Sequence, residues 1–380
     1  MHQHRVALYF NLVGTHQQGI ARGIIEFAKQ HPDWRLHGAF WTLDEVRSIR
    51  DWRGSGIIAE LHDPEQAKLL IDTGLPIVDI AQTIDSPRLH KVINNNPMTG
   101  RMVGRHFLDN GFTNFAFCGI KDTRWSASRF DGFAEGTGVD PSRIATLVRP
   151  EKWWNEQAHP GQLRRYLESL PRPAAIMAAN DVVGVKLTHA CAMLGIDVPQ
   201  QVAVVGVDDE YLLCHLSSPP LSSVPFNRVL LGMKAAELLD ELMNKRPVSE
   251  GAVIIPPGSI SVRASSDIIT ADDPDIRRVR EFIRDQAITL NGVNAVVAFS
   301  NMGRRNLERR FRQTVGRSIL EEINRAKVNH ACRLLLQTDK YITNIAVACG
   351  LPNLNRFYEL FRQHTGTTPK EFRSSRRMAD

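Results

Sequence analysis

The sequence predicts an α/β region of two subdomains followed by an all-α region with two helix-turn-helix units. Short β-branched runs alternate with helical patterns up to about residue 265, and the segments after about residue 275 have the period of a helix. Between them, the stretch SSDIITADDP is polar, acidic and closed by a proline, which is typical of a linker. The predicted limits are 1–265 for the first domain, 266–274 for the linker and 275–380 for the second domain.

The first region reads as a series of strands and helices. The runs expected as strands are 6–10, 56–61, 76–81, 115–120, 174–180 and 202–207. The segments expected as helices are 19–30, 64–74, 98–111, 161–170 and 182–195. This alternation predicts parallel, doubly wound sheets. A region of this length exceeds one typical sheet domain, so we expect two subdomains with a cleft between them.

A ligand site is expected beyond the carboxyl ends of the strands, where open α/β sheets bind their ligands. The residues that follow the predicted strands are Asn11, Gln82–Thr83, Lys121–Arg129, Asn180–Asp181 and Asp208–Asp209. The sequence has neither G-x-G-x-x-G after the first strand nor G-x-x-x-x-G-K-[ST], which excludes the usual dinucleotide and P-loop sites.

Positive charge is concentrated in the last quarter of the chain. Residues 274–380 hold 20 Lys and Arg against 10 Asp and Glu, whereas the rest of the chain holds 27 against 31. Lys and Arg supply most of the sequence-independent affinity for nucleic acid, so a separate polyanion-binding module is indicated. A solvated surface with surplus arginine is the alternative.

An imperfect internal repeat lies in this basic region. Residues 295–316 and 345–366 both read as a short apolar helix, a turn and a longer helix that ends in F-R-Q-x-x-G. Two such helix-turn-helix units on one chain can reach adjacent segments of a major groove. Leu307, Phe311 and their counterparts in the second unit are expected in the core, because their spacing puts them on one helix stripe.

The region 276–373 resembles the AraC-type transcriptional regulators, whose C-terminal signature is present as GLPNLNRFYELFRQHTGTTPKEFR (350–373). The resemblance implies double-stranded operator DNA as partner. The outward candidates on the two recognition helices are Arg304, Arg305, Asn306, Glu308, Arg309, Asn353, Asn355, Arg356, Tyr358 and Glu359. Arg can read guanine and Asn adenine, but each residue can equally hold a phosphate, and the sequence leaves this open.

The stretch 174–224 resembles the effector domain of LacI-type regulators and periplasmic sugar-binding proteins, which share A-x-x-A-x-N-D, V-V-G-x-D-D and a terminal L-S-S-V. Arg129-Phe130-Asp131-Gly132-Phe133 is similar to that family's R-x-x-G-F element. The fold implied is a periplasmic-binding-protein-like sensor. The effector-binding candidates are Asn11, Trp125, Arg129, Asn180, Asp181 and Asp208. Carboxylate and guanidinium groups suit sugar hydroxyls, and an indole suits the C–H face of a sugar ring.

Each of these candidates also has a purely structural interpretation. Asp208 can cap a turn, Asp181 can start a helix, Arg129 can form an interdomain ion pair and Trp125 can belong to the core. The pair Trp153-Trp154 fits a lid, an interface or the core.

LacI-type regulators carry their DNA-binding unit before the sensor, whereas an AraC-type unit follows the sensor here. This combination resembles the xylose-responsive activators among the AraC-type regulators. The resemblance implies D-xylose as effector rather than a cofactor, a homodimer, and activation of transcription with RNA polymerase. The start of the chain has no secretory signal pattern, so we expect a cytoplasmic protein without a membrane segment. A regulator of another pentose or of a sugar phosphate is the alternative within this class.

Two enzymatic alternatives are weaker. A sugar enzyme fused to a DNA-binding module would need a nucleophile and a base, and the strand ends offer none at a recognisable spacing. A DNA alkyl-transferase would need a reactive cysteine, but Cys118 and Cys214 end or follow apolar runs and are expected to be buried. The five cysteines show no C-x-x-C spacing, so no metal site is expected. We therefore expect a protein that is not an enzyme.

Overall fold

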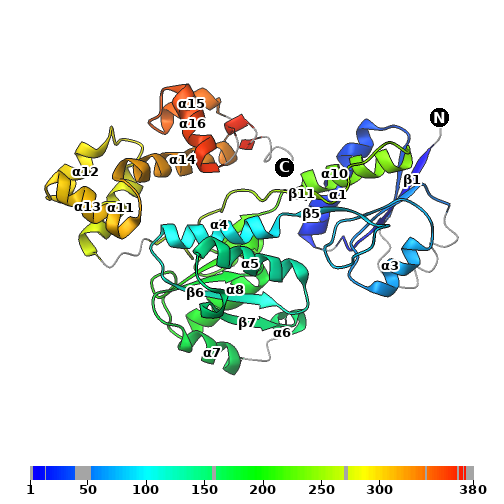
Figure 1. Ribbon diagram of the computed structural model, residues 1–380, viewed down its shortest axis with the longest axis horizontal. Helices are drawn as coiled ribbons and strands as arrows, with labels where there is room; N and C mark the ends of the chain where they lie inside the picture. The colour runs from blue at the N-terminus through cyan, green and yellow to red at the C-terminus, as the bar shows by residue number, and fades with distance from the viewer. Residues whose placement is uncertain are drawn as a thin grey trace.

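The computed structural model of the chain has two α/β lobes and a helical domain (Figure 1). It describes residues 3–12, 14–38, 53–155, 160–268, 273–338, 340–365, 368–370 and 372–373. The predicted fold class is confirmed: parallel sheets come first, and the described residues after Pro274 form helices. The domain limits 1–265, 266–274 and 275–380 stay a prediction, and 269–272 of the linker lie outside the described residues.

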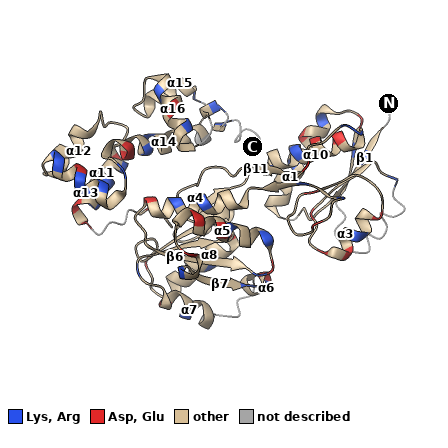
Figure 2. Cartoon of the chain, viewed as in Figure 1, with Lys and Arg blue, Asp and Glu red and all other residues tan. Residues whose placement is uncertain are grey.

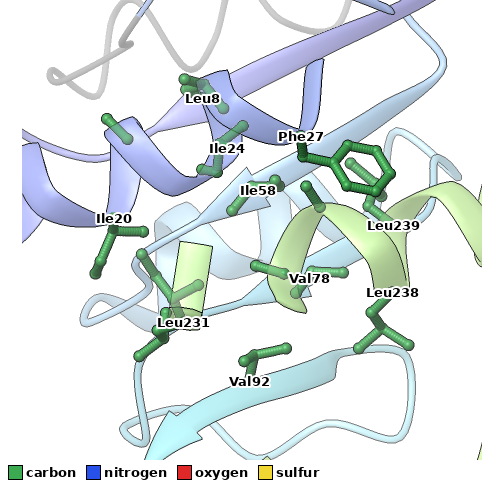
Figure 3. Packing of buried hydrophobic residues seen from close by; sticks show 14 of the residues in the cluster. Leu8, Ile20, Ile24, Phe27, Ile58, Val78, Val92, Leu231, Leu238 and Leu239 are labelled. Carbon is green, nitrogen blue, oxygen red and sulfur yellow. The ribbon is translucent and has the colours of Figure 1, made fainter. Parts of the chain in front are cut away.

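The first lobe is built on a six-stranded sheet in the order β11-β5-β4-β3-β1-β2, in which the paired strands run parallel. Its elements are β1 (His4–Tyr9), α1 (Thr15–Gln30), β2 (Trp34–His37), β3 (Gly56–Ala59), α3 (Pro64–Ile71), β4 (Ile77–Asp79), β5 (His90–Asn94), α10 (Arg228–Met243) and β11 (Val253–Ile255). The strands read as continuous apolar runs because both faces of the sheet are covered. Figure 3 shows one such face, where Leu8 and Ile58 of the sheet cluster with Ile24 of α1 and Leu231 of α10.

The second lobe is built on a five-stranded parallel sheet in the order β10-β9-β8-β6-β7. Its strands are β6 (Asn114–Ile120), β7 (Ala145–Arg149), β8 (Ala174–Ala178), β9 (Val202–Asp208) and β10 (Ser222–Pro225). Its helices are α4 (Asn96–Asp109), α5 (Arg124–Thr137), the short 3-10 helix Pro141–Arg143, α6 (Glu151–Asn155), α7 (Pro160–Ser169), α8 (Asp181–Met193) and α9 (Tyr211–Leu216). Two apolar clusters, one on each face of the sheet, form its core.

Helices α4 and α5 pack with their backbones in contact. A Cβ atom added at Gly100 of α4 would lie 2.1 Å from the carbonyl oxygen of Arg129, and one added at Gly132 of α5 would lie 2.0 Å from that of Pro97. Real Cβ atoms do not approach other atoms so closely, so only glycine fits at these two positions. The close approach makes the two helices one tightly packed unit.

The chain crosses between the two lobes three times, at 94–96, 225–228 and 255–258. These segments bind one another. The amide of Asn95 donates to the carbonyl of Ile255 at 2.8 Å, and the amide of Gly258 donates to that of Pro225 at 2.9 Å. The crossings therefore form one hinge.

The helical domain consists of two helix-turn-helix units joined by a long helix. Its helices are α11 (Pro274–Gln286), α12 (Val293–Ser300), α13 (Arg304–Val315), α14 (Ile319–Gln337), α15 (Ile342–Ala348) and α16 (Leu354–Thr365). Helix α14 starts with a capping box of Ser318 and Glu321, and it contributes Ile323 to the core of the first unit and Val328 to that of the second. One helix thus fixes both units relative to each other.

The six strands predicted in the first region are present as β1, β3, β4, β6, β8 and β9. The strands β2, β5, β7, β10 and β11 and the helices α5, α6, α9 and α10 were not singled out by the pattern. The added strands are three to five residues long and stand mostly at sheet edges, so they carry little periodicity. Across the described ranges, no helix combines the length and apolar character needed to cross a bilayer.

Candidate functional site

Side chains of the two lobes meet beside the hinge. A pocket there is lined by Gln82, Asp85, Lys91 and Ile93 of the first lobe and by Arg124, Ala127 and Ser128 of the second. Asp85 forms ion pairs with Lys91 at 2.9 Å and with Arg124 at 2.5 Å. The pair with Arg124 connects the two lobes. The predicted cleft therefore has polar groups on both sides.

Arg129 is nearly buried at the lobe boundary, with 5% of its surface exposed. Its guanidinium lies over the Trp125 ring at 4.4 Å and over the Phe226 ring at 4.9 Å. Its Nε donates to Oδ1 of Asn96 at 3.0 Å, and its Nη1 donates to the carbonyl of Ala179. Burial lowers the pKa of Arg129 to about 10, so the group is still a cation at neutral pH.

Asn96 connects Arg129 to the first lobe. Its Oδ1 accepts from Arg129, while its Nδ2 donates to Oε1 of Gln82 at 2.9 Å. Asn96 is the first residue of α4 and lies directly at the hinge. A single amide thus contacts one residue on each side of the cleft.

His16 of α1 faces the same region. Its ring lies edge-on to Phe226 at 6.1 Å, and its buried Nδ1 has no hydrogen-bond partner among the residues that the structure describes. Burial lowers the pKa of His16, an effect opposed by Asp208, so the imidazole is neutral at pH 7. Buried polar atoms are nearly always paired with protein, water or ligand, so the His16 Nδ1 is a candidate hydrogen-bonding group for a molecule in the cleft.

Asp208 ends β9 with a positive φ of 111°, which is rare for a residue with a side chain. Arg228 holds this conformation: its guanidinium donates to the Asp208 carbonyl and forms an ion pair with Glu210 at 2.9 Å. The charge of Asp208 acts on both His16 and Arg129. Asp208 is therefore close enough for its charge to affect both the predicted Arg129 and His16, which the sequence did not single out.

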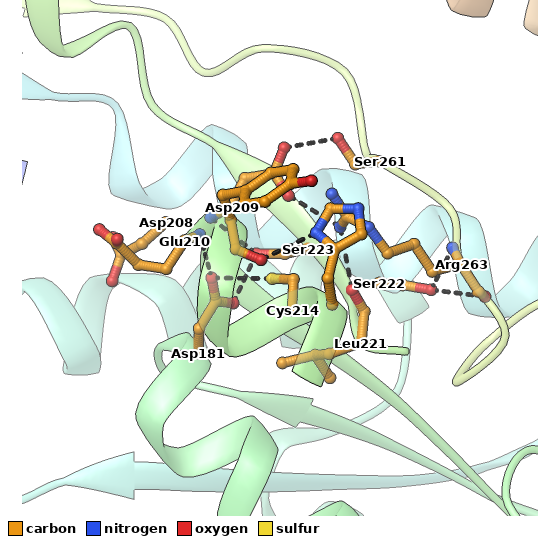
Figure 4. A network of polar contacts seen from close by, with 12 residues as sticks. Asp181, Asp208, Asp209, Glu210, Cys214, Leu221, Ser222, Ser223, Ser261 and Arg263 are labelled. Atoms are coloured by element: carbon orange, nitrogen blue, oxygen red, sulfur yellow. Dashed lines mark hydrogen bonds and ion pairs between the residues drawn. The ribbon is translucent and has the colours of Figure 1, made fainter. Parts of the chain in front are cut away.

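Asp181 lies in a different environment, inside a polar network (Figure 4). It is 1% exposed; its Oδ1 accepts from the Ser223 hydroxyl at 2.6 Å, and its Oδ2 accepts from the Glu210 amide at 2.8 Å and the Cys214 thiol at 3.3 Å. Burial, with Asp208 nearby, raises the pKa of Asp181. These hydrogen bonds to the Asp181 carboxylate connect β10, α9 and α8.

Asn180 and Asn11 differ from the other candidates. Asn180 is the N-cap of α8, and its Oδ1 accepts from the amide of Val183 at 3.0 Å. Asn11 is exposed just after β1. The structure thus places Trp125 against Arg129, and the charges of Asp208 and Asp181 both act on Arg129, whereas Asn180 makes a helix-capping contact.

The tryptophan pair on α6 belongs to the second lobe's core. Trp154 is buried, its Nε1 donates to the carbonyl of Gly119 at 2.9 Å, and its ring packs edge-on to Trp153 at 4.8 Å. Trp154 is therefore a core residue, which decides between the three interpretations that the sequence leaves open for it.

The first helix-turn-helix unit presents the polar face of α13 to solvent. The ribbon of α13 carries several Lys and Arg positions, coloured blue in Figure 2. Leu307 and Phe311 are buried, as predicted. The exposed candidates on this helix are Arg304, Arg305, Asn306, Glu308 and Arg309. On this face Arg304 pairs with Glu308 at 2.9 Å and Arg309 donates to Asn306 at 3.1 Å, both within the same helix.

The turn of this unit carries Phe299-Ser300-Asn301 where a glycine is common. Asn301 has a φ of 54°, the left-handed conformation that Asn tolerates better than most residues. In the second unit the left-handed residue is Gly350, with a φ of 67°, which corresponds to Ser300 in the repeat and so lies one position earlier. Both turns therefore have a left-handed residue, although the sequences differ.

The second unit presents α16 in the same manner. Phe357, Leu360 and Phe361 are buried. The candidates Asn353, Asn355, Arg356 and Glu359 are exposed, and Tyr358 is half-buried. Asn353 caps the helix by accepting from the Arg356 amide at 3.0 Å, and Arg356 pairs with Glu359 at 2.7 Å. Lys327 of α14 donates to the carbonyls of Leu290 and Gly350, which ties the two units together.

Four cleft residues lie outside the sequence-based set: His16, Asn96, Phe226 and Arg228. His16 is the only histidine of α1 and gives no periodic signal. Phe226 and Arg228 come from the segment that crosses back to the first lobe. Asn96 is the nearest to a signal, because it stands where the LacI-type family has a D-N step. Within the described ranges, no group of three His, Cys, Asp or Glu is placed to hold a metal ion.

Comparisons with known proteins agree with this division. Residues 105–266 match a periplasmic binding protein-like domain, and residues 296–375 match a helix-turn-helix domain. The xylose operon regulatory protein of Haemophilus influenzae is 30% identical over 97% of this chain and 98% of its own length. That of Escherichia coli K12 is 29% identical over 98% and 97%.

Solved structures give the same result. The structure of a xylose-binding transcription activator matches with a TM-score of 0.62 and 28% identity, covering 98% of both chains. A transcriptional regulator in complex with cellobiose matches with a TM-score of 0.58 over 70% of this chain, and at 20% identity it supports the fold of the lobes alone.

A two-lobed sensor joined to two helix-turn-helix units defines a ligand-responsive transcription regulator. The relatives match this architecture along nearly the whole chain. The chain belongs to the family of the xylose operon regulatory proteins.

Proposed function

We propose that this regulator binds D-xylose between its two lobes and, in response, activates genes of xylose catabolism. The observation that carries the proposal is the group of Arg129, His16 and Asp208, to which both lobes contribute. The names of its relatives support xylose as the sugar. We further propose a cytoplasmic homodimer that binds operator DNA and acts with RNA polymerase, without enzymatic activity of its own.

The charges around His16 favour a neutral sugar over a sugar phosphate. The charged groups that act on its ring are Asp208, Glu60, Arg228 and Arg129, two acidic and two basic. Glu60 also accepts from the amide of Gln17 at 3.1 Å. A phosphate group needs a surplus of cationic donors; these four charges balance, and Lys91 and Arg124 in the neighbouring pocket are both paired with Asp85.

The roles of the individual residues are part of the proposal. Arg129 donates to sugar oxygens from its fixed position, Trp125 shapes the cleft beside it, and Asp208 accepts from hydroxyl groups. Asn11, Asn180 and Asp181 complete the predicted set. Of these, Asn180 and Asp181 support the site by holding the start of α8, as their hydrogen bonds indicate.

The proposal is tested by isothermal titration of the purified protein with D-xylose, L-arabinose, D-ribose and D-glucose. Saturable heat with xylose alone supports it, and no heat with any of the four refutes the sugar assignment. In the Asp208→Ala variant we expect xylose heat to disappear while DNA binding without sugar is kept. A fluorescein-labelled duplex, selected by the wild-type protein from a random-sequence library, serves as DNA probe. Normal xylose affinity in this variant would remove Asp208 from the site.

A further inference from the structure

The last residue of α4 is held by three arginines of the helical domain. Oδ1 of Asp109 lies 2.7 Å from Nη1 of Arg317, and its Oδ2 lies 2.6 Å from Nη1 of Arg325. The carbonyl oxygen of Asp109 accepts from Nη2 of Arg317 at 3.0 Å and from Nη2 of Arg280. A single residue of the second lobe thus receives guanidinium groups from α11, from α14 and from the turn before α14.

Glu322 of α14 completes this cluster. Its Oε2 lies 2.5 Å from Nε of Arg317, and its Oε1 lies 3.4 Å from Nε of Arg280. The Arg280 side chain is 2% exposed, and those of Arg317 and Arg325 are about one-fifth exposed. Charge-assisted contacts to partly buried arginines are stronger than exposed ion pairs, which contribute little. We call Asp109, Arg280, Arg317, Glu322 and Arg325 the interdomain cluster.

The charge balance makes Asp109 the sensitive member. The cluster has three cations and two anions. Loss of the Asp109 charge would leave the three arginines with Glu322 as their only anion within the cluster. The C-terminal end of α4 also favours cations, because the helix dipole is negative there. Two contacts involve the segment just before the helical domain: Arg284 of α11 pairs with Asp267 at 3.6 Å, and Ser266 hydrogen-bonds His106 of α4 at 3.0 Å.

The other end of α4 lies in the candidate effector cleft. Asn96 begins the helix and contacts both Arg129 and Gln82. In Figure 1, α4 runs along the second lobe from the hinge near β5 to the helical domain. Its partner α5 carries Trp125 and Arg129 and is locked to α4 by glycine-to-backbone contacts. The pair therefore connects the cleft to the interdomain cluster without a flexible joint between them.

We propose that the interdomain cluster makes the DNA-binding domain a rigid extension of the second lobe, so that closure of the cleft moves the recognition helices relative to the first lobe. This inference rests on the proposed function for the identity of the ligand. Coupling between two sites requires that the ligand favours one arrangement of the domains over another. Through the interdomain cluster, an effector that closes the cleft would favour one arrangement of the DNA-binding domain relative to the first lobe.

The test compares Asp109→Asn with Glu135→Gln, a matched control. Glu135 forms an ion pair with Arg101 at 2.8 Å on the same helix pair, but both side chains are well exposed, and the pair lies outside the interdomain cluster. Small-angle X-ray scattering of the sugar-free protein measures domain docking directly. We expect the radius of gyration of Asp109→Asn to increase and that of Glu135→Gln to equal the wild-type value. A scattering profile of Asp109→Asn that superimposes on that of the wild type would refute the cluster as a clamp.

The second measurement is the ratio of DNA dissociation constants without and with saturating D-xylose, with the selected duplex as probe. Coupling in regulatory proteins typically amounts to about 5- to 150-fold. We expect this ratio to fall to nearly 1 in Asp109→Asn, with sugar affinity in the absence of DNA unchanged, while Glu135→Gln keeps the wild-type ratio. A wild-type ratio in Asp109→Asn contradicts the inference.

Two controls separate the possible failures. Arg325→Gln removes a different member of the cluster and must reproduce the Asp109→Asn result, and thermal unfolding shows that each variant is folded. If xylose changes neither heat nor DNA affinity of the wild type, the proposed effector is wrong. The scattering comparison needs no sugar, so it still decides whether the cluster docks the DNA-binding domain.

Discussion

Replacing Gly100 by alanine tests whether α4 and α5 depend on backbone contact. The new Cβ would lie 2.1 Å from the Arg129 carbonyl and 2.6 Å from the Phe133 amide, so the helices must separate by roughly 1 Å to reach ordinary contact. Overpacking a well-packed core costs about 1–3 kcal/mol, and the better helix propensity of alanine returns up to about 1 kcal/mol. Because the new Cβ would overlap backbone atoms rather than a flexible side chain, the cost lies in the upper half of that range, and we expect Gly100→Ala to be destabilising by about 1–2 kcal/mol.

The assay is the melting temperature of the sensor lobes by differential scanning calorimetry. Each kcal/mol shifts the melting temperature of a domain of this size by about 2–4 °C, so a decrease of about 2–8 °C is expected. Gly161→Ala is the matched control, because it also lies in a helix but a Cβ there meets no atom of the described residues within 4 Å. Equal melting temperatures for Gly100→Ala and the wild type would refute the backbone contact between the two helices.

Three further outcomes are expected. Burial, reinforced by Arg325, lowers the pKa of His106 from 6.5 to about 4. The unfolded chain therefore binds the proton first, so the contribution of neutral His106 to stability is full above pH 6.5 and is lost as the pH falls toward 4. In urea titrations the acid loss of stability should be smaller in His106→Gln, and an equal loss would contradict this. Iodoacetamide should label none of the five cysteines of the native protein quickly, because all are buried and the pKa of Cys118 is raised to about 12; fast stoichiometric labelling would instead favour an alkyl-transferase. Arg305→Ala or Arg356→Ala should weaken binding of the selected duplex by about 1–3 kcal/mol if the residue reads a base, and unchanged affinity in both would exclude these recognition helices.

Local spacing predicted a large part of the structure. The i, i+4 spacing of Trp125 and Arg129 places the guanidinium over the indole, and the spacing of Leu307 and Phe311 places both on the buried side of α13. The strands with continuous apolar runs were found for the same reason. Each of these features depends on residues within one helix or strand.

The remaining features depend on contacts between distant segments. The carboxylate of Asp181 contacts Ser223, 42 residues away, and Asn96 contacts Arg129, 33 residues away. The interdomain contact of Asp109 with Arg317 spans 208 residues. No periodicity links such pairs, so a single sequence does not show whether a polar side chain faces a ligand, a cap or another domain.

The number of crossings between the lobes determines where an attached module is carried. Because the crossings are odd in number, a chain that starts in one lobe leaves from the other: β1 belongs to the first lobe, whereas Ser265 is bound to Val204 of the second. A module joined after the sensor is therefore borne by the second lobe, and one joined before β1 would be borne by the first. Moving the DNA-binding unit from one end of such a sensor to the other transfers it to the other lobe. Closure of the cleft would then move the unit with the first lobe relative to the second, instead of with the second lobe relative to the first.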